Sequence, residues 1–330
     1  MNPLTLSTLR LLSATDFLSG EEIAARLGVT RATVWNAVRD AGARGVSVER
    51  IRGRGYRLVD APVWLDAAAI RTGLGPRAST FDVRIVEEIA STNTTVLAEA
   101  AAGAPSGTVL VAESQTAGRG RRGRSFLTSL GGALTFSLLW RFDQGVAGLS
   151  GLSLVVGLAC AEGLEAAGAR AVQVKWPNDL QHAGRKLGGI LIELHGDALG
   201  PSAAVIGVGV NVRMPDAVAA RVDQPVIDAV STGATDDRNR LLADMLSALA
   251  ARLEAFAANG FAPLEPAFRA RHALQGRDVA IAMPDGCTVT GRVDGTGPDG
   301  ALQVFTAGGL RSFHGGEVSV RREPEGRVHG

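Results

Sequence analysis

Four arginines and three glycines fill the seven residues from Gly118 to Arg124, and Lys186 follows in the segment Arg185-Lys186-Leu187-Gly188-Gly189. Guanidinium groups present forked, planar donors that suit carboxylate and phosphate oxygens, and glycines let the backbone approach a ligand closely. Apolar residues at 109–111 and 133–140 predict buried strands on both sides of this arginine loop, residues 118–124. The sequence therefore predicts a site for anions at the rim of a folded sheet.

Two other interpretations of the arginine loop compete with this one. A run of arginines and glycines is, taken alone, typical of a solvated or nucleic-acid-contacting segment. The pattern Gly118-x4-Gly123-Arg124-Ser125 also misses the phosphate-binding P-loop by one residue, because Arg stands where that loop has Lys. A P-loop must open a helix, yet Gly131-Gly132 and an expected strand follow it closely. The P-loop is excluded, and a nucleotide and carboxylate site built on a sheet is kept as the hypothesis.

Three further segments carry side chains suited to chemistry. Ser91-Thr92-Asn93 places two hydroxyls and an amide at the start of a helix, although simple helix capping also explains these residue types. Lys175-Trp176-Pro177-Asn178-Asp179 ends a strand with a charged residue on each side of a proline turn. Gly207-Val208-Gly209-Val210-Asn211 is a strand with glycines on one face, which lets a flat ligand lie against bare backbone.

Apolar periodicity in the middle of the chain predicts a mixed sheet flanked by helices. Expected strands run over 81–89, 107–113, 133–140, 172–176, 186–194 and 204–212, and expected helices over 93–102 and 152–168.

Residues 1–62 predict a winged helix-turn-helix unit. Ser19 and Glu22 form a capping box, Gly28 ends the first helix, and Thr30 caps a second helix with a polar, basic outer face. From residue 31 to 57 seven arginines oppose two acidic residues, a local charge of 7 − 2 = +5. A small helical protein-interaction domain is the alternative. The expected DNA contacts are Arg31, Thr33, Asn36 and Arg39 on the second helix and Arg52 and Arg54 on the following hairpin wing.

Composition places the chain among ordinary globular proteins. Its 330 residues, 46% apolar and 20% charged, are enough for two or three domains with a sizeable core. No apolar run reaches the roughly 18 residues of a membrane span, and the first residues lack a signal peptide, so a cytoplasmic protein with no membrane partner is expected. Two cysteines and five scattered histidines suggest neither a disulfide framework nor a metal site.

Taken together, these motifs and their order closely resemble biotin protein ligases. The resemblance spans nearly the whole chain, and the N-terminal unit resembles that of the bifunctional subclass, which also represses biotin-synthesis genes. It implies a catalytic fold like that of class II aminoacyl-tRNA synthetases and a small SH3-like barrel at the C-terminus. The expected class is α+β, with a winged helix at 1–62, a linker at 63–79, a catalytic domain at 80–272 and the barrel domain at 273–330. The motifs are Ser91-Thr92-Asn93, Gln115, the arginine loop, residues 175–179 and 185–191, Gly207-x-Gly209-x-Asn211, and Gly315-Gly316-Glu317-Val318-Ser319.

The resemblance implies an ATP-dependent reaction that needs Mg²⁺. Biotin and ATP give biotinyl-5′-adenylate, and a lysine of a biotin carboxyl carrier protein then takes the biotinyl group; operator DNA and a second copy of the chain are the other implied partners. Catalysis is assigned to Lys186, Arg121 and Asp179. Biotin binding is assigned to Ser91, Thr92, Asn93, Gln115, Gly118, Arg119, Arg121, Lys186, Gly188 and Gly189, with room made by Gly207 and Gly209. ATP binding is assigned to Arg119, Arg121, Arg124, Phe126, Asn178, Lys186, Asn211 and Arg321, with Glu317 reaching back toward the nucleotide.

Two positions depart from the family pattern. Phe126 stands where a Trp commonly follows the arginine loop, which keeps an apolar lid but removes an indole N–H. Residues 212–235 contain no aromatic residue, so adenine is expected to pack on aliphatic side chains such as Val226 or Ile227. The coupling between adenylate and dimerisation therefore stays open.

Two alternative functions remain. A lipoate or octanoate protein ligase resembles this fold and chemistry, but residues 175–179 and the arginine loop favour biotin. A DNA-binding regulator that senses a small molecule without catalysis is the other, and Lys186 and Arg121 argue against it.

Overall fold

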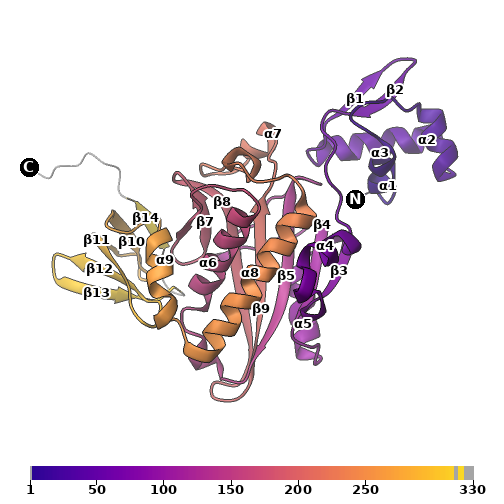
Figure 1. Ribbon diagram of the computed structural model, residues 1–330. Helices are drawn as coiled ribbons and strands as arrows, with labels where there is room; N and C mark the ends of the chain where they lie inside the picture. Colours follow the sequence, from indigo (N-terminus) through magenta and orange to yellow (C-terminus); the bar gives the residue numbers. More distant parts are fainter. Residues whose placement is uncertain (1, 316–318, 323–330) are drawn as a thin grey trace, which may run out of the picture.

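The structure is a computed structural model that describes residues 2–315 and 319–322. An N-terminal helical unit, a central sheet packed with helices and a C-terminal antiparallel sheet follow one another along the described chain (Figure 1). This architecture belongs to the α+β class, as predicted. No helix of the described residues is long and apolar enough to cross a membrane.

The N-terminal unit is a winged helix-turn-helix. Its helices are α1 (Thr5–Leu11), α2 (Gly20–Leu27) and α3 (Arg31–Ala43), and strands β1 (Val48–Ile51) and β2 (Gly55–Leu58) form the antiparallel wing. The Ser19 side chain accepts a hydrogen bond from the Glu22 amide, and Gly28 ends α2 with a φ of 66°. Thr30 caps α3 in the same way. The local caps follow the sequence because each satisfies amide or carbonyl groups that a helix end leaves without partners.

The segment from Val63 to Asp66 leaves this unit and enters the core of the central domain. There the guanidinium of Arg238, which is 0% exposed, donates to the Val63 carbonyl from Nε and Nη2, at 3.2 and 3.0 Å. Glu113 accepts from the Leu65 amide at 2.8 Å and forms an ion pair with Arg238 at 2.5 Å. Asn239 binds the backbone of the same segment on the other side. Helix α4 (Ala67–Leu74) and a 3₁₀ turn (Gly75–Thr80) then lead into the sheet.

Seven strands form the central sheet in the order β3-β4-β5-β9-β8-β7-β6. Strands β3 and β4 run parallel, and the remaining neighbours are antiparallel. The strands are β3 (Asp82–Ile89), β4 (Thr108–Gln115), β5 (Ala133–Phe142), β6 (Gln173–Lys175), β7 (Asp179–His182), β8 (Arg185–Gly196) and β9 (Ser202–Asn211).

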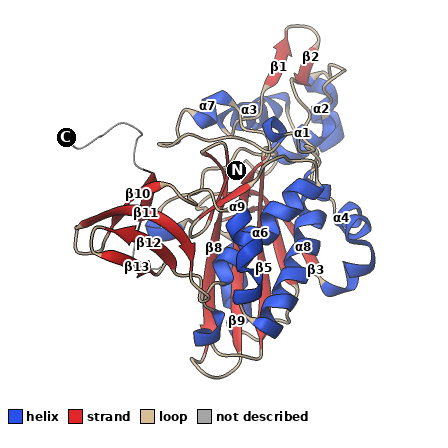
Figure 2. Cartoon of the chain, turned by 60° about the vertical axis from the view of Figure 1, so that its left-hand side comes forward, coloured by secondary structure: helices blue, strands red, loops and turns tan. Residues whose placement is uncertain are grey.

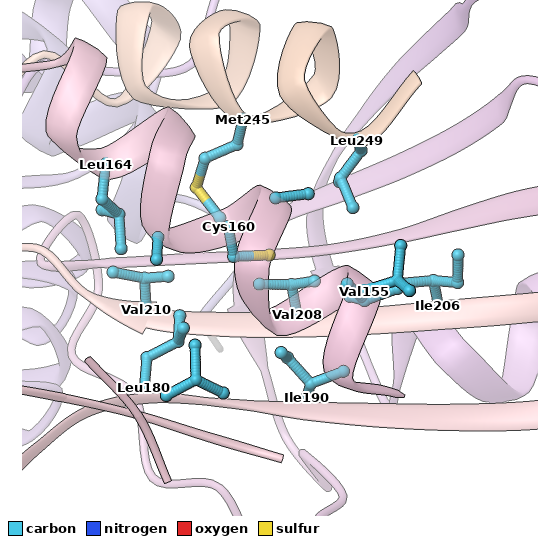
Figure 3. Packing of buried hydrophobic residues seen from close by; sticks show 14 of the residues in the cluster. Val155, Cys160, Leu164, Leu180, Ile190, Ile206, Val208, Val210, Met245 and Leu249 are labelled. Atoms are coloured by element: carbon cyan, nitrogen blue, oxygen red, sulfur yellow. The ribbon is translucent and has the colours of Figure 1, made fainter. Parts of the chain in front are cut away.

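Helices cover the two faces of this sheet unequally. On one face α6 (Leu152–Ala166) and α8 (Arg238–Asn259) pack side by side, and Cys160 and Met245 meet Val208 and Ile190 there (Figure 3). On the opposite face a smaller apolar cluster joins α5 (Thr92–Ala101) to β4, β5 and β9. Alternate strand residues point to opposite faces, so the two clusters share strands without sharing side chains. The candidate site lies on the face that α5 covers in part.

The winged helix docks on the central domain through the segment that follows the arginine loop. Leu130 is buried in the hydrophobic core of the N-terminal unit, and its amide donates to the Arg44 carbonyl at 3.1 Å. Arg44 also forms an ion pair with Glu88 of β3 at 3.2 Å, and Arg10 pairs with Glu87 at 3.6 Å. A short stretch of chain therefore joins the arginine loop to the N-terminal unit.

The C-terminal part is a five-stranded antiparallel, SH3-like sheet. Its order is β13-β12-β11-β10-β14, and it stands beside the central domain at the end near β8 (Figure 2). Trp176 Nε1 donates to the Gly300 carbonyl at 3.0 Å across this junction, and α9 (Glu265–Arg271) leads into it. The strands are β10 (Asp278–Ala282), β11 (Thr288–Thr296), β12 (Leu302–Thr306), β13 (Gly309–Phe313) and β14 (Ser319–Arg322). Shorter elements are η2 (Arg121–Gly123), η3 (Val146–Leu149), α7 (Asp216–Ala219), η4 (Val230–Thr232) and η5 (Ala262–Leu264).

The expected strands and helices of the central domain are present, with ends that differ by a few residues. Several elements of the central domain were not predicted, among them strand β7 and helices α7, α8 and α9. Strand β7 follows the proline turn directly, and helix α8 runs for 22 residues. The sheet nevertheless has the mixed, helix-flanked form that the periodicity predicts.

Candidate active site

A cavity of about 690 Å³ opens between the arginine loop, the start of α6 and strand β8. Its wall includes the whole arginine loop, residues 151–153 and 190–192, Pro177 and Gly315. The arginine loop and the motifs at 175–179 and 185–191, which are far apart in the chain, therefore meet around one cavity. Gly315, the first residue of the motif 315–319, reaches the same cavity.

The arginine loop is a tight hairpin. The Phe126 amide donates to the Gly118 carbonyl at 3.0 Å, and the Gly120 amide donates to the Arg124 carbonyl at 2.7 Å. A Cβ at Gly118 would lie 2.7 Å from the Phe126 carbonyl oxygen, so only glycine fits where the two ends of the hairpin meet. Arg122 has a φ of 57°, which sharpens the turn. The tight turn brings all four arginines of the loop to the wall of the cavity.

Arg121 points across the cavity to two other motifs. Its Nη1 donates to Asn178 Oδ1 at 3.1 Å, and its Nη2 donates to the carbonyl oxygen of Gly315. Burial lowers the pKa of Arg121, and the neighbouring Arg122 lowers it further, while Asp179 opposes both effects. A partly desolvated guanidinium gains more from an incoming anion than one in water does.

The side chains of Lys186 on β8 and Asp179 on β7 meet across the two neighbouring strands. Lys186 Nζ is 2.7 Å from Asp179 Oδ1, and both side chains are about four-fifths buried, at 21% and 22% exposed. A Cβ at Gly189 would lie within 3.6 Å of both groups. The backbone of Lys186 also pairs with the 225–227 segment, through the Pro225 carbonyl and the Ile227 amide. The ammonium is thus held at a defined place on the sheet.

The hydroxyl and amide groups at the start of α5 form a buried polar cluster. Ser91 caps the helix by accepting from the Thr94 amide at 3.4 Å. The Thr92 amide and hydroxyl donate to Gln115 Oε1 at 2.8 and 3.3 Å. The Ser137 hydroxyl, which is 0% exposed, lies 2.8 Å from Thr92 Oγ1 and 2.9 Å from Asn93 Oδ1. Simple capping accounts for Ser91 but not for the other members.

Arg119 leaves the arginine loop in the opposite direction from Arg121. Its Nη2 and Nη1 donate to the two carboxylate oxygens of Glu193 at 2.8 and 3.1 Å, and Nη1 also reaches Thr94 Oγ1 at 3.2 Å. Glu193 accepts a further hydrogen bond from Asn93 Nδ2 at 2.7 Å. The carboxylate therefore joins the arginine loop to the polar cluster.

The glycines of β8 and β9 leave a stretch of the sheet without side chains beside Asn93 and Phe126. Gly189 and Gly209 are Cα partners, and Gly207 lies opposite Ser137 and Leu191 in the neighbouring strands. A Cβ at Gly207 would lie 2.4 Å from Asn93 Oδ1, and one at Gly209 would lie 2.6 Å from the Phe126 ring. Gly207 and Gly209 must therefore lack side chains, because Asn93 and the ring of Phe126 occupy the space that a Cβ would need.

The remaining residues assigned to the nucleotide are distributed more widely. Asn178 is tied to Arg121 and also donates to the Ile190 carbonyl at 2.7 Å. Asn211 is buried, and its Nδ2 donates to the Ile227 carbonyl at 3.2 Å. Arg124 is exposed at the mouth of the cavity.

The aliphatic candidates and the C-terminal motif lie at the edges of the site. Val226 is half-buried where its segment pairs with Lys186, whereas Ile227 is buried. The backbone of Arg321 pairs with Ala280 in the C-terminal sheet. Glu317 falls outside the described residues.

Most of the expected DNA contacts are exposed on the N-terminal unit. Arg39 lies over the Trp35 ring at 4.7 Å and Arg54 over the Phe17 ring at 4.5 Å, while Arg31 pairs with Glu21. Asn36 and Arg52 are exposed as well, and Thr33 is half-buried beside Thr30. The recognition helix and the wing therefore present cations outward, as phosphate contacts require.

Two residues of the site were not predicted. Glu193 lies in the apolar run of β8, two and four residues from Leu191 and Gly189 on the same face, so a strand period of two would have placed it beside the site. Ser137 lies in an apolar run of β5 and carries no local signal. Among the described residues, no group of three or more histidine, cysteine, aspartate or glutamate side chains could hold a metal ion.

Comparison with known proteins follows the same division of the chain. The sequence model of the Biotin/lipoate A/B protein ligase family matches residues 85–211, and an HTH domain model matches residues 5–57. The chain is 37% identical to the bifunctional ligase/repressor BirA of Salmonella typhimurium, over 97% of both chains. It is 34% identical to the biotin–[acetyl-CoA-carboxylase] ligase of Mycobacterium tuberculosis, over 77% of this chain and 95% of that one.

A solved structure is similar over nearly three quarters of this chain. The biotin protein ligase from Aquifex aeolicus in complex with biotin and ATP aligns with a TM-score of 0.63 and 28% identity. The match covers 73% of this chain and 99% of that one.

Proposed function

The chain belongs to the family of bifunctional biotin ligase/repressors, and from this premise we propose how its own residues divide the work. It is a biotin protein ligase that uses ATP and carries the DNA-binding domain of a repressor. The observation that carries the residue assignment is that Arg121, which lines the cavity, and Lys186 bind neighbouring residues of one motif, Asn178 and Asp179. The neutral polar cluster that contains Thr92 and Gln115 is joined to the arginine loop through Asn93, Glu193 and Arg119.

The first half-reaction joins two anions, which is its main electrostatic difficulty. An oxygen of biotin's carboxylate attacks the α-phosphorus of MgATP, the bond from that phosphorus to the bridging oxygen breaks, and pyrophosphate leaves with the electron pair. Lys186 and Arg121 neutralise charge on the carboxylate and the α-phosphate and hold the two in line. The low exposure of Lys186 strengthens this effect, because fewer water molecules screen the charges.

Biotin's neutral ureido ring fits the polar cluster. Thr92 and Gln115 offer hydroxyl and amide groups at the start of α5, and Gly188 and Gly189 leave room on the sheet for the rest of the molecule. Phe126 closes the apolar side, packed on Gly209. Arg119 and Gly118 bring the arginine loop over the tail, whose carboxylate faces the cations.

The second half-reaction needs a neutral amine. The acceptor lysine attacks the carbonyl carbon of the adenylate, the bond from that carbon to the phosphate oxygen breaks, and AMP leaves. A free lysine has a pKa of about 10.4, so at neutral pH its amine must lose a proton near the site. We assign this step to Asp179, the carboxylate paired with Lys186, which orients or deprotonates the amine. The acceptor is a biotin carboxyl carrier protein.

The remaining assignments concern partners of the whole protein. Mg²⁺ arrives with ATP, held by phosphate oxygens and water as is usual for this ion. Asn178, Asn211, Arg124 and Arg321 complete the nucleotide side. Operator DNA meets α3 and the wing, and a homodimer is the form proposed to bind it.

Pyrophosphate exchange with biotin, lipoate and octanoate in parallel tests the proposed function. Exchange with biotin alone is the expected result. Exchange that prefers lipoate or octanoate would point to the related acyl ligases, and no exchange with any acid would point to a regulator without catalysis. Transfer of biotin to a purified carrier domain then tests the acceptor.

A further inference from the structure

Glu193 binds two parts of the site at once. Its two carboxylate oxygens accept from both terminal nitrogens of Arg119, at 2.8 and 3.1 Å, and from Asn93 Nδ2 at 2.7 Å. Arg119 belongs to the arginine loop and Asn93 to α5, whereas Glu193 lies on strand β8. A single side chain on the rigid sheet therefore fixes a loop residue and a helix residue relative to each other.

The carboxylate also fixes the direction of the Asn93 amide. An ionised carboxylate only accepts hydrogen bonds, so the NH₂ group of Asn93 must face Glu193 and its Oδ1 must face away. That oxygen lies 2.9 Å from the Ser137 hydroxyl, which lies 2.8 Å from Thr92 Oγ1. A chain of polar contacts thus runs from Arg119 through Glu193 to Thr92 and on to Gln115.

We propose that Glu193 is a positioning residue for biotin: it sets the polar cluster that holds the ring and the arginine that meets the carboxylate end in one fixed relation. The proposal deepens the proposed function and rests on it. Gly207 supports the same arrangement, because a side chain there would displace Asn93 Oδ1. Rigid placement of both ends of a ligand lowers the entropy lost when it binds.

An ordinary ion pair is the competing explanation. Arg119 is 45% exposed and Glu193 22%, and pairs near the surface typically contribute little to stability. Such a pair would leave the binding of biotin unchanged. The two explanations therefore differ in the KM for biotin, which a merely structural role would not alter.

The test compares Glu193→Ala and Glu193→Gln with a matched control, Glu99→Gln. Glu99 pairs with both terminal nitrogens of Arg84 on the outer part of the same sheet, away from the cavity. Hydrogen bonds to charged groups are strong enough that Glu193→Ala should raise the biotin KM about tenfold or more. The ATP KM should rise less than the biotin KM, because both contacts of Glu193, Asn93 and Arg119, are assigned to biotin, whereas of these two Arg119 alone is also assigned to ATP. Glu193→Gln keeps an acceptor but not the charge, and should lie between Ala and wild type.

A variant lacking both partners tests how Glu193 acts. In the background Asn93→Ala plus Arg119→Ala, adding Glu193→Ala should change the biotin KM by less than about twofold, because the side chains through which it acts are already gone. Thermal unfolding of every variant shows whether the fold is kept, and Glu193→Gln serves if the alanine variants do not fold.

The outcomes separate the two proposals. If wild type exchanges pyrophosphate with biotin while both Glu193 variants match its biotin KM within about twofold, the positioning role is overturned and the proposed function stands. An undiminished effect of Glu193→Ala in the doubly substituted background also overturns it. If wild type does not exchange with biotin, the proposed function itself fails and the role of Glu193 falls with it.

Discussion

Replacing Arg238 by methionine should strongly destabilise the protein without touching the cavity. The guanidinium is 0% exposed and donates to Glu113 at 2.5 Å, to the Ala133 carbonyl at 3.2 Å and to the Val63 carbonyl. Methionine fills similar space but supplies no donor. Removing one member of a buried ion pair typically costs about 3–5 kcal/mol, because the remaining charge stays buried without a partner.

The double variant Arg238→Met plus Glu113→Gln isolates the cause of this loss. A neutral amide at residue 113 can still accept from the Leu65 amide, and it removes the buried charge. The double variant should therefore recover much of the free energy of unfolding that the single variant loses, since a buried pair is often replaceable by neutral groups. Arg77→Met, which breaks an exposed pair with Glu254, is the control and should cost less than about 1 kcal/mol.

Urea unfolding followed by tryptophan fluorescence measures these differences, with the m-value checked for each variant. A loss below about 1 kcal/mol in Arg238→Met would refute the reasoning, because it would mean that the interior tolerates an unpaired Glu113. A double variant no more stable than the single one would also refute it, since the loss would then come from packing or from the Val63 and Ala133 carbonyls.

Three further predictions follow from other parts of the structure. Lys186→Ala should slow pyrophosphate exchange by about a hundredfold, roughly 3 kcal/mol, with an unchanged unfolding midpoint, and near-normal exchange would remove Lys186 from the reaction. Arg52→Ala plus Arg54→Ala should weaken operator binding and lower the salt slope by about 0.9 per lost phosphate contact while ligation continues, and an unchanged slope in a mobility-shift titration would exclude the wing from the contact. Burial lowers the pKa of His272 to about 4, whereas its pKa in the unfolded chain is near 6.5. As the pH falls from 6.5 toward 4, the unfolded state gains the proton first, and the free energy of unfolding drops by up to about 3 kcal/mol. His272→Phe, beside Phe268, should flatten this part of the pH–stability profile, and an equally steep profile in the variant would contradict the assignment.

Local sequence patterns predicted several helix ends and many of the strands and helices of this fold. The caps at Ser19, Gly28 and Thr30 are present because each depends on residues within a few positions of one another. The period-two and period-3.6 patterns likewise gave the strands and helices of the central domain. Helix α8 was not predicted, although eleven of its residues are buried and most of its apolar positions are alanine and leucine, which favour helices.

The order of the strands in the sheet explains why some residues of the site could not be predicted from the sequence. The roles of Glu193 and Ser137 depend on which strands are neighbours: β5, β9 and β8 are adjacent in the sheet although β6 and β7 separate β5 from β8 in the chain. The arginine loop was predicted as one cluster, yet Arg119 and Arg121 point to different partners. A hairpin only a few residues long decides that division, and residue types alone do not encode it.

Leu130 gives the two halves of this protein a shared component. It belongs to the chain of the catalytic domain but completes the hydrophobic core of the DNA-binding domain. A homologous winged helix grafted onto this ligase would need a gap in its hydrophobic core that accepts Leu130. A ligase domain expressed alone would expose this leucine to water. Recombination or engineering that treats residue 62 as a clean boundary would cut through one packing unit. The modular unit for exchange is therefore the winged helix together with the segment that carries Leu130.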